Sequence, residues 1–148
     1  MPSKATPIDL SDSFEKIPVK IFPNSTDGSA FVARQIADLI RMKQKKKEKC
    51  VLGLATGYTP KSLYKELVRM HREEKLSFKN VITFNLDEYY PIANNALQSY
   101  NRFMKTNLFD HIDINPKNIN IPNGETLKDD VKEHCKKNKK MIEDAGGI

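Results

Sequence analysis

The sequence predicts an α/β fold in three layers, with a mainly parallel sheet that carries helices on both faces. Two short apolar runs, residues 50–54 and 81–86, have the length and composition of strands that are buried on both sides. Around them, apolar residues recur at helical spacing. Strands that alternate with helices are typical of a parallel sheet, because each parallel connection has to cross over the sheet.

The composition is that of one globular domain. The 148 residues are 39% hydrophobic and 30% charged, and a chain of this length can bury a sizeable core. No apolar run approaches the roughly 20 residues of a membrane span, and residues 1–13 contain no apolar segment of signal-peptide length. The two cysteines, Cys50 and Cys135, form no metal-binding or redox motif. We therefore expect a reduced, cytoplasmic protein without a membrane partner.

The net charge of +6 is concentrated in two lysine-rich segments, residues 43–49 and 128–140. Both lie at the ends or outer faces of predicted helices. No nucleic-acid recognition motif and no interleaved aromatic residues accompany the charge. We interpret these lysines as solvated helix surface and expect no nucleic-acid partner.

The first elements precede residue 50. Residues 1–16 are expected to form a flexible N-terminal arm, and residues 17–148 the domain itself. Residues 19–22 resemble the first short strand of the alternation, and Asp27 is suited to cap the helix that follows. The buried face of this helix is predicted from apolar residues at helical spacing: Val32, Ile36, Leu39 and Ile40.

A second helix follows the strand at 50–54. A turn at residues 55–58 leads to Thr59, which can cap this helix, and to Pro60, which fits its first position. Its predicted apolar stripe consists of Leu63, Tyr64, Leu67, Val68, Met70 and His71.

The remaining elements follow the strand at 81–86. Apolar residues between Tyr100 and Phe109 indicate a helix, and residues 118–121 a short strand before a turn at 122–124. Residues 126–145 read as a polar helix.

Gly146 and Gly147 are expected to stop that last helix. Ile148 then reads as the start of another strand. We therefore expect the chain to stop inside an α/β domain and to leave a position beside the central strands unfilled.

The strand at 50–54 runs into a glycine turn, Thr56, Gly57, Tyr58 and Thr59, at the start of a helix. In open α/β sheets, ligands bind beyond the carboxyl ends of the strands. The free N–H groups and the dipole of a helix N-terminus favour an anion, and two threonine hydroxyls add donors. The turn therefore suits a phosphate group, with an ordinary capped turn as the alternative.

The strand at 81–86 ends in two adjacent carboxylates, Asp87 and Glu88. Neighbouring side chains on an extended segment point to opposite sides. One carboxylate can therefore face the crevice as a general base, while the other turns into the protein and finds hydrogen bonds or an ion pair. A solvated acidic loop is the alternative, and the location of both turns at one sheet edge favours a joint site.

The three histidines indicate no further chemistry. None pairs with a cysteine or carboxylate at metal-ligand spacing, and no Ser-His-Asp or nucleophilic cysteine arrangement is present. We interpret His71 as part of a helix face and His134 as surface.

Several motifs resemble the glucosamine-6-phosphate deaminase family. They are residues 54–60 (LATGYTP), 76–81 (LSFKNV), 83–89 (TFNLDEY), 99–104 (SYNRFM), 108–114 (LFDHIDI) and 118–124 (NINIPNG). The match covers about residues 18–148 and keeps the order and spacing of the motifs. The chain is thus identified as the N-terminal portion of such a protein, with a Rossmann-like sheet.

The resemblance implies that the full protein converts glucosamine 6-phosphate and water into fructose 6-phosphate and ammonia, in amino-sugar catabolism, without an organic cofactor or metal. Asp87 matches the family's base, which moves a proton between sugar carbons C2 and C1. The resemblance further implies a substrate-binding set of Thr56, Gly57, Tyr58, Thr59 and Glu88, and a homo-oligomer in the full-length protein.

The sequence departs from the family pattern in two ways. Tyr58 stands where the family usually has glycine, which predicts an awkward backbone angle or a crowded phosphate, and Ala55 often corresponds to a proline. The family's ring-opening histidine, its partner carboxylates, its basic phosphate clamp and its lid all follow the point where this chain ends. The isolated chain is therefore expected to be inactive.

Two alternatives to a deaminase remain open. One is a related sugar-phosphate isomerase or lactonase, although the pair Tyr89-Tyr90 after the two acids favours the deaminase. The other is a non-catalytic, deaminase-like domain that binds a sugar phosphate within a larger or fused protein, which Tyr58 keeps open.

Overall fold

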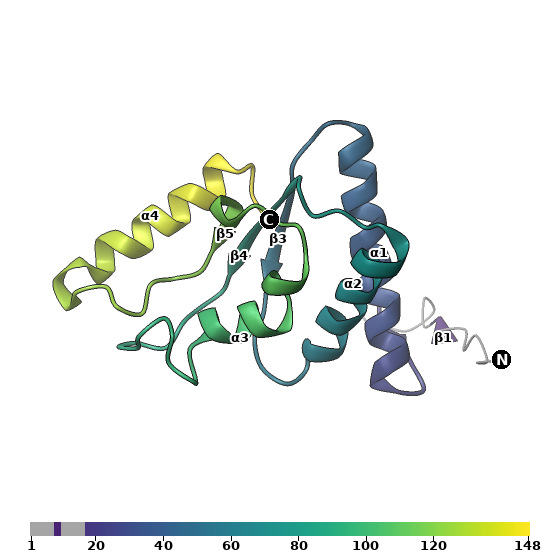
Figure 1. Cartoon of the computed structure of the whole chain (residues 1–148), viewed down its shortest axis with the longest axis horizontal. Coiled ribbons are helices and arrows are strands. Elements are labelled where there is room, and N and C mark those ends of the chain that lie inside the picture. The colour runs from purple at the N-terminus through teal and green to yellow at the C-terminus, as the bar shows by residue number, and fades with distance from the viewer. Residues whose placement is uncertain (1–7, 10–16) are drawn as a thin grey trace.

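The computed structural model describes residues 8–9 and 17–148 (Figure 1). Apart from Ile8 and Asp9, the expected N-terminal arm lies outside the described residues. The sheet predicted at the centre of the fold is present. Strands β3 (Cys50–Leu54), β4 (Val81–Asn85) and β5 (Ile119–Asn120) form it in the order β3-β4-β5, with both pairings parallel. The α/β class and the two predicted parallel strands are therefore confirmed, with β4 in the centre of the described sheet and ending at Asn85, one residue earlier than predicted, and β3 at its edge.

The expected first strand does not belong to this sheet. β2 (Lys20–Ile21) pairs antiparallel with β1 (Ile8–Asp9) in a separate two-stranded sheet. Its two residues are both exposed, whereas a strand of the parallel sheet would be covered on both sides. The prediction that residues 19–22 begin the parallel alternation was wrong for this reason.

Helix α1 (Ser25–Lys45) is capped by Asn24, whose side chain accepts a hydrogen bond from the Asp27 N–H at 2.9 Å. The prediction of Asp27 as the cap was wrong. Asp27 lies instead in the first turn, where a negative charge complements the helix dipole.

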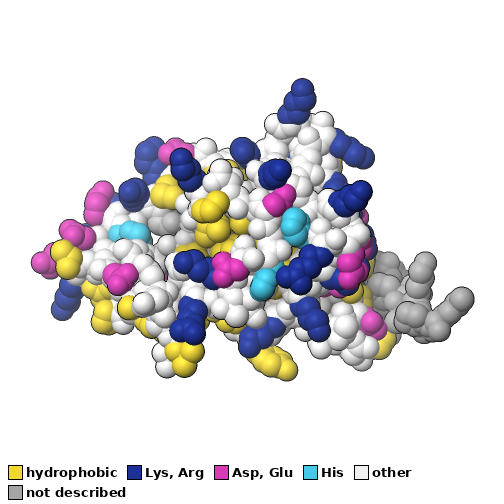
Figure 2. Space-filling view, in the orientation of Figure 1, with side chains coloured by type: hydrophobic (Ala, Val, Ile, Leu, Met, Phe, Trp, Pro, Cys, Tyr) yellow, Lys and Arg dark blue, Asp and Glu magenta, His cyan; other side chains and the backbone are white. Residues whose placement is uncertain are grey.

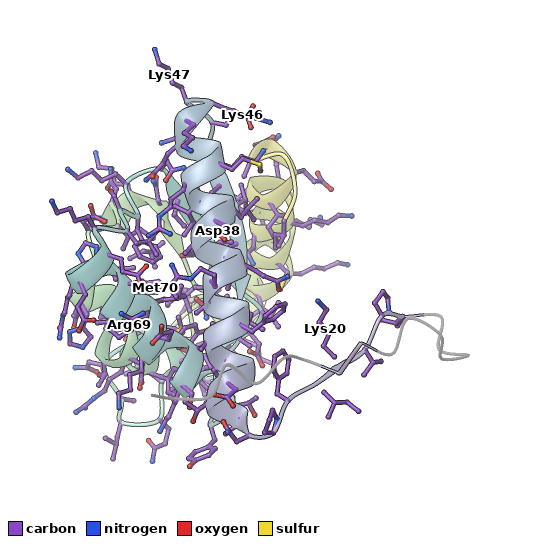
Figure 3. All side chains as sticks on the ribbon, turned by 90° about the vertical axis from the view of Figure 1, so that its right-hand side faces the viewer. Lys20, Asp38, Lys46, Lys47, Arg69 and Met70 are labelled. Carbon is purple, nitrogen blue, oxygen red and sulfur yellow. The ribbon has the colours of Figure 1, made fainter. Side chains whose placement is uncertain are left out.

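The buried face of α1 is also rotated from the predicted one. It consists of Ala33, Ala37 and Ile40, while Val32 and Leu39 are 40% and 38% exposed. Two alanines in this stripe allow α2 to approach closely, so the face with the smaller side chains is the one that packs. Beyond the last turn, Lys46 and Lys47 extend away from the body of the protein (Figure 3).

Helix α2 (Lys61–Glu74) buries Tyr64, Leu67, Val68 and Met70, as predicted. Its start differs from the prediction. The N-cap is Pro60, with no side-chain hydrogen bond, so Thr59 does not cap the helix.

The later elements are shorter than predicted. α3 spans Tyr100–Asn107, and 3-10 turns follow at Phe109–His111 (η1) and Pro116–Asn118 (η2). The predicted helix at 126–145 begins with a 3-10 turn, Lys128–Asp130 (η3), and becomes α4 at Val131–Asp144. Gly146 and Gly147 have positive φ angles and stop α4 as expected.

The layers place helices on both faces of the sheet. Figure 1 shows α1 and α2 on one side of the sheet and α4 on the other. One buried cluster joins α1, α2, α3 and one face of the strands; it includes Ala37, Ile40, Cys50, Leu54, Tyr64, Leu67, Val81 and Met104. Among the described residues, no helix is both long and apolar enough to cross a membrane.

Candidate active site

The parallel register brings the two candidate turns to one edge of the sheet. Leu54, the last residue of β3, lies opposite Asn85, the last residue of β4. The glycine turn leaves the sheet directly after Leu54, and Asp87 follows Asn85 by two residues. The two segments that the sequence predicted as one site therefore start from adjacent strand ends.

Two buried polar side chains hold the beginning of the glycine turn. The Tyr64 hydroxyl donates to the carbonyl of Ala55, and the Asn85 amide donates to the carbonyl of Leu54 at 3.3 Å. Burial raises the pKa of Tyr64 to about 12, against the opposite influence of its hydrogen bond to Ala55. The phenol therefore stays neutral and acts as a donor at ordinary pH.

Tyr58 does not strain the turn. The residue in the left-handed region is Gly57, with φ +103°, and in the described part of the chain only Lys47 and Lys75 are non-glycine residues with positive φ. The Tyr58 side chain is 89% exposed, and its ring lies 5.9 Å from the Lys61 ammonium. The awkward angle predicted for Tyr58 was wrong, because Gly57 takes up that conformation and the ring turns outward. Thr56 is half-buried, while Thr59 is exposed.

Asp87 and Glu88 have different environments. Asp87 is exposed and makes no hydrogen bond or ion pair with another described side chain. The Glu88 carboxylate accepts from the hydroxyl of Ser99 at 3.0 Å and from the backbone N–H groups of Tyr100 at 2.9 Å and Asn101 at 3.0 Å. It thus satisfies donors at the start of α3, and Asp87 is the carboxylate left free to accept a proton.

The loop after the two acids is held in place by the turn at residues 122–124. The N–H of Ile92 donates to the carbonyl of Gly124 at 2.9 Å. A Cβ at position 124 would lie 2.7 Å from the carbonyl oxygen of Ile92 and 2.8 Å from that of Tyr89. Only glycine allows this approach of two backbones, so the predicted turn also supports the loop of the candidate base.

A groove of about 550 Å³ runs between the end of β4 and α4. Its lining residues include Leu86, Asp87, His134, Asn138 and Ile142. His134 is half-buried, and its Nε2 accepts from the N–H of Asn123 at 3.1 Å. The interpretation of His134 as plain surface was therefore wrong. Its helical spacing with Asn138 and Ile142, which line the same groove, was the signal that could have identified it.

The described residues contain no cluster of three or more His, Cys, Asp or Glu side chains placed to hold a metal ion. The arrangement thus offers a free carboxylate and a turn at a helix N-terminus, which follow adjacent strand ends. Such a pair can bind an anionic group and remove a proton from a molecule bound between them.

Comparison with known proteins gives a consistent result. Residues 23–147 match the model of a family described as glucosamine-6-phosphate isomerases/6-phosphogluconolactonase. A glucosamine-6-phosphate deaminase-like protein of Bacteroides thetaiotaomicron is 43% identical over 147 residues, which is 99% of this chain and 22% of that protein. A glucosamine-6-phosphate deaminase of Thermoanaerobacter sp. is 44% identical over 117 residues, which is 79% of this chain and 46% of that enzyme.

Solved structures agree with the sequence relatives. A monomeric glucosamine-6-phosphate deaminase is similar with a TM-score of 0.78 and 38% identity, over 84% of this chain and 49% of that chain. The 6-phosphogluconolactonase of Plasmodium vivax is similar with a TM-score of 0.66 and 27% identity, over 84% of this chain and 43% of that chain. The chain thus spans about half the length of most of these relatives, and about a fifth of the Bacteroides protein.

Proposed function

The chain belongs to the family of glucosamine-6-phosphate isomerases and 6-phosphogluconolactonases, and we propose that it carries the phosphate loop and the general base of a glucosamine-6-phosphate deaminase. The reaction converts glucosamine 6-phosphate and water into fructose 6-phosphate and ammonia. The observation that carries the proposal is that Asp87, a free carboxylate, and the glycine turn follow adjacent strand ends, within a chain that is 44% identical to a deaminase of this name.

The geometry supports the following roles. The turn formed by Thr56, Gly57, Tyr58 and Thr59 binds the sugar phosphate through backbone N–H groups and hydroxyls. Asp87 moves the proton between C2 and C1. Glu88 positions Asp87. Its hydrogen bonds to the start of α3 fix the backbone next to Asp87, so its part in substrate binding is indirect.

The substitution Asp87→Asn, made in the full-length protein, tests whether Asp87 is the base. The substitution keeps the shape of the side chain and removes its ability to accept a proton. We expect turnover and exchange of the substrate's C2 proton with solvent to fall together by about 100- to 10,000-fold, while substrate affinity changes far less. Proton NMR in deuterium oxide follows the exchange. Exchange at the parental rate in Asp87→Asn would show that another group is the base.

The 148-residue chain alone is expected to release no ammonia from glucosamine 6-phosphate at an enzymatic rate. It supplies a base and one phosphate loop, and the deaminases it resembles are about twice as long. A coupled assay for ammonia measures this. Turnover of the isolated chain within the usual range of roughly 1–1000 per second would contradict the expectation.

The long Bacteroides relative favours a second candidate function. Its similarity extends over 147 residues of this chain, yet this chain is 22% of its length. A sugar-phosphate-binding domain within a larger protein, without its own catalysis, fits that observation. Binding of glucosamine 6-phosphate without any exchange of its C2 proton in the gene-encoded protein would support this candidate over the deaminase.

The remaining parts of the proposal concern the setting of the protein. A cytoplasmic location and a homo-oligomeric full-length protein are supported by the family resemblance alone. The similar solved deaminase is monomeric, so the oligomeric state calls for a direct measurement.

A further inference from the structure

Helix α2 separates its charges onto two flanks. On the flank toward α1, Arg69 bonds to Glu66 at 2.6 Å, to Glu73 at 2.9 Å and to Glu74 at 2.8 Å. Glu74 also bonds to Arg34 of α1 at 2.6 Å. All three glutamates of α2 are therefore neutralised on this flank.

The flank toward α3 is basic and uncompensated. Lys61, Lys65 and Arg72 make no ion pair with any other residue that the structure describes. They line one groove of about 340 Å³ between α2 and the segment from α3 to η1. The other lining residues are Val68, Thr106, Asn107 and His111, so no carboxylate faces it. Figure 2 shows Lys and Arg side chains close to histidine side chains at the centre of this face, with Asp or Glu side chains beside them.

The contact between Arg72 and His111 leaves the arginine charge in place. His111 Nε2 lies 2.9 Å from the carbonyl of Thr106 and must donate to it. His111 Nδ1, 3.2 Å from the Arg72 guanidinium, is then the acceptor. The guanidinium is thus oriented by a neutral ring instead of a carboxylate, and its full charge remains available to an anion.

Lys61 is oriented as well. Its ammonium lies 5.9 Å from the ring of Tyr58 and 5.8 Å from the ring of Phe103. Such contacts hold a cation without neutralising it. Cations at both ends of the groove are therefore positioned by uncharged partners, which distinguishes this flank from the lysines of α4, where Lys136, Lys139 and Lys140 lie within 4 Å of acidic side chains on the same helix.

We infer that the groove between α2 and α3 is a second anion site, one that binds a small phosphorylated molecule. Lys61 and Lys65 are one helical turn apart, and Arg72 lies about two turns further, so the cations span roughly 16 Å of helix. The volume is that of a small-molecule site, and Val68 offers an apolar floor for a carbon skeleton. The groove runs along α2 away from the glycine turn: Lys61 at its end adjoins that turn, and no residue of the turn itself lines the groove. The inference does not rest on the proposed deaminase activity.

The test is a titration of the 148-residue chain with phosphate compounds at low salt, monitored by the amide signals in NMR spectra. Inorganic phosphate, pyrophosphate and glucose 6-phosphate serve as probes. We expect saturable shifts at Val68, Thr106, Asn107 and His111. The double variant Lys65→Gln/Arg72→Gln is expected to weaken this binding at least about tenfold, since two charge-assisted contacts are lost. Both positions are exposed, and thermal unfolding checks that the variant stays folded.

Lys132→Gln is the matched control. It removes one exposed positive charge on α4 and lies outside the groove, so binding at the groove should stay unchanged. Lys61 is left intact in every variant because it adjoins the glycine turn. A phosphate bound at the glycine turn would shift the amide signals of residues 55–60. If those signals do not shift while the groove signals do, the result counts against the proposed active site only. The second site would be overturned if the groove signals do not shift, or if they shift equally in the double variant. It would also be overturned if Lys132→Gln weakens binding at the groove as much as the double variant does.

Discussion

At the scale of single residues, the adjacent acids Asp87 and Glu88 divide two tasks between them. Asp87 stays exposed, whereas the Glu88 carboxylate collects four hydrogen bonds, three from the start of α3 and one from the N–H of Tyr89. A carboxylate at a helix N-terminus satisfies free N–H groups and complements the dipole. Glu88 therefore stabilises the loop that presents Asp87.

Glu88→Gln should lower stability more than it affects proton transfer. Glutamine keeps one acceptor oxygen and places an NH₂ group against donors, so some N–H groups of α3 lose their partner. We expect the free energy of unfolding, measured with urea, to fall by about 1–3 kcal/mol.

Asp87→Asn is the control for this measurement, because Asp87 makes no side-chain contact that folding depends on. Its unfolding midpoint should match that of the unsubstituted chain. If Glu88→Gln and Asp87→Asn unfold at the same urea concentration, the capping role of Glu88 is refuted.

The division between these two acids was predicted from sequence: one carboxylate is hydrogen-bonded within the protein and the other is exposed. The contact of His134 with Asn123 was not. It depends on how the turn at residues 122–124 folds back against α4, so that the backbone N–H of Asn123 reaches the His134 ring, and residues eleven positions apart carry no local signal of such an approach.

At the scale of elements, the interface between α1 and α2 (called the joint below) combines closely packed alanines of α1 with a network of charged side chains. Ala33 and Ala37 let the helices approach, and Glu74 bridges Arg34 of α1 and Arg69 of α2. Hydrogen bonds from Arg34 and Arg69 lower the pKa of Glu74 to about 2. The network therefore makes the joint sensitive to acid.

The stability of the joint should fall at low pH. A carboxyl group whose pKa is lower in the folded state stabilises the fold above its unfolded pKa, and that contribution is lost as the pH falls toward the folded value. For Glu74 the window lies between its ordinary value of 4.5 and about 2. Urea midpoints measured at several pH values across this window should drop less in Glu74→Gln than in the unsubstituted chain.

Asp129→Asn is the control for acid sensitivity. Asp129 is exposed and has no bonded partner among the described side chains, so its loss should leave the pH profile unchanged. An identical acid profile for Glu74→Gln and the unsubstituted chain would mean that the network contributes nothing measurable.

The two central strands were predictable because a buried strand is a short, continuous apolar run. The faces of α1 were harder to predict. The apolar residues of this helix, including Val32, Ile36, Leu39 and Ile40, extend beyond one stripe, and periodicity alone ranks large side chains above alanines. Ala33 and Ala37 are buried because α2 packs against them, and this depends on tertiary packing that periodicity does not contain.

At the scale of the whole molecule, the α/β class follows from the alternation of elements. What alternation does not specify is which surfaces stay uncovered. β3 has β4 as its single strand partner among the described residues. Val32, Leu39 and Met42 of α1 are 38–43% exposed, and Leu86 and Ile148 are 71% and 65% exposed. The described chain thus combines an open sheet edge with exposed apolar side chains.

These surfaces predict that the 148-residue chain associates with itself. An edge strand and exposed apolar side chains both favour contacts between copies, whereas the net charge of +6 opposes them. Salt shortens the range of that repulsion, to about 8 Å at 0.15 M. Sedimentation velocity should therefore show a larger average mass at higher protein concentration, and a further increase with salt.

The variant Leu39→Glu/Met42→Glu places charges on the exposed face of α1 and should shift the distribution toward monomer without lowering the thermal unfolding temperature. A monomer at every concentration and salt level would show that the apolar surfaces on α1 and at the open edge of β3 are too small or too scattered to bind a second copy.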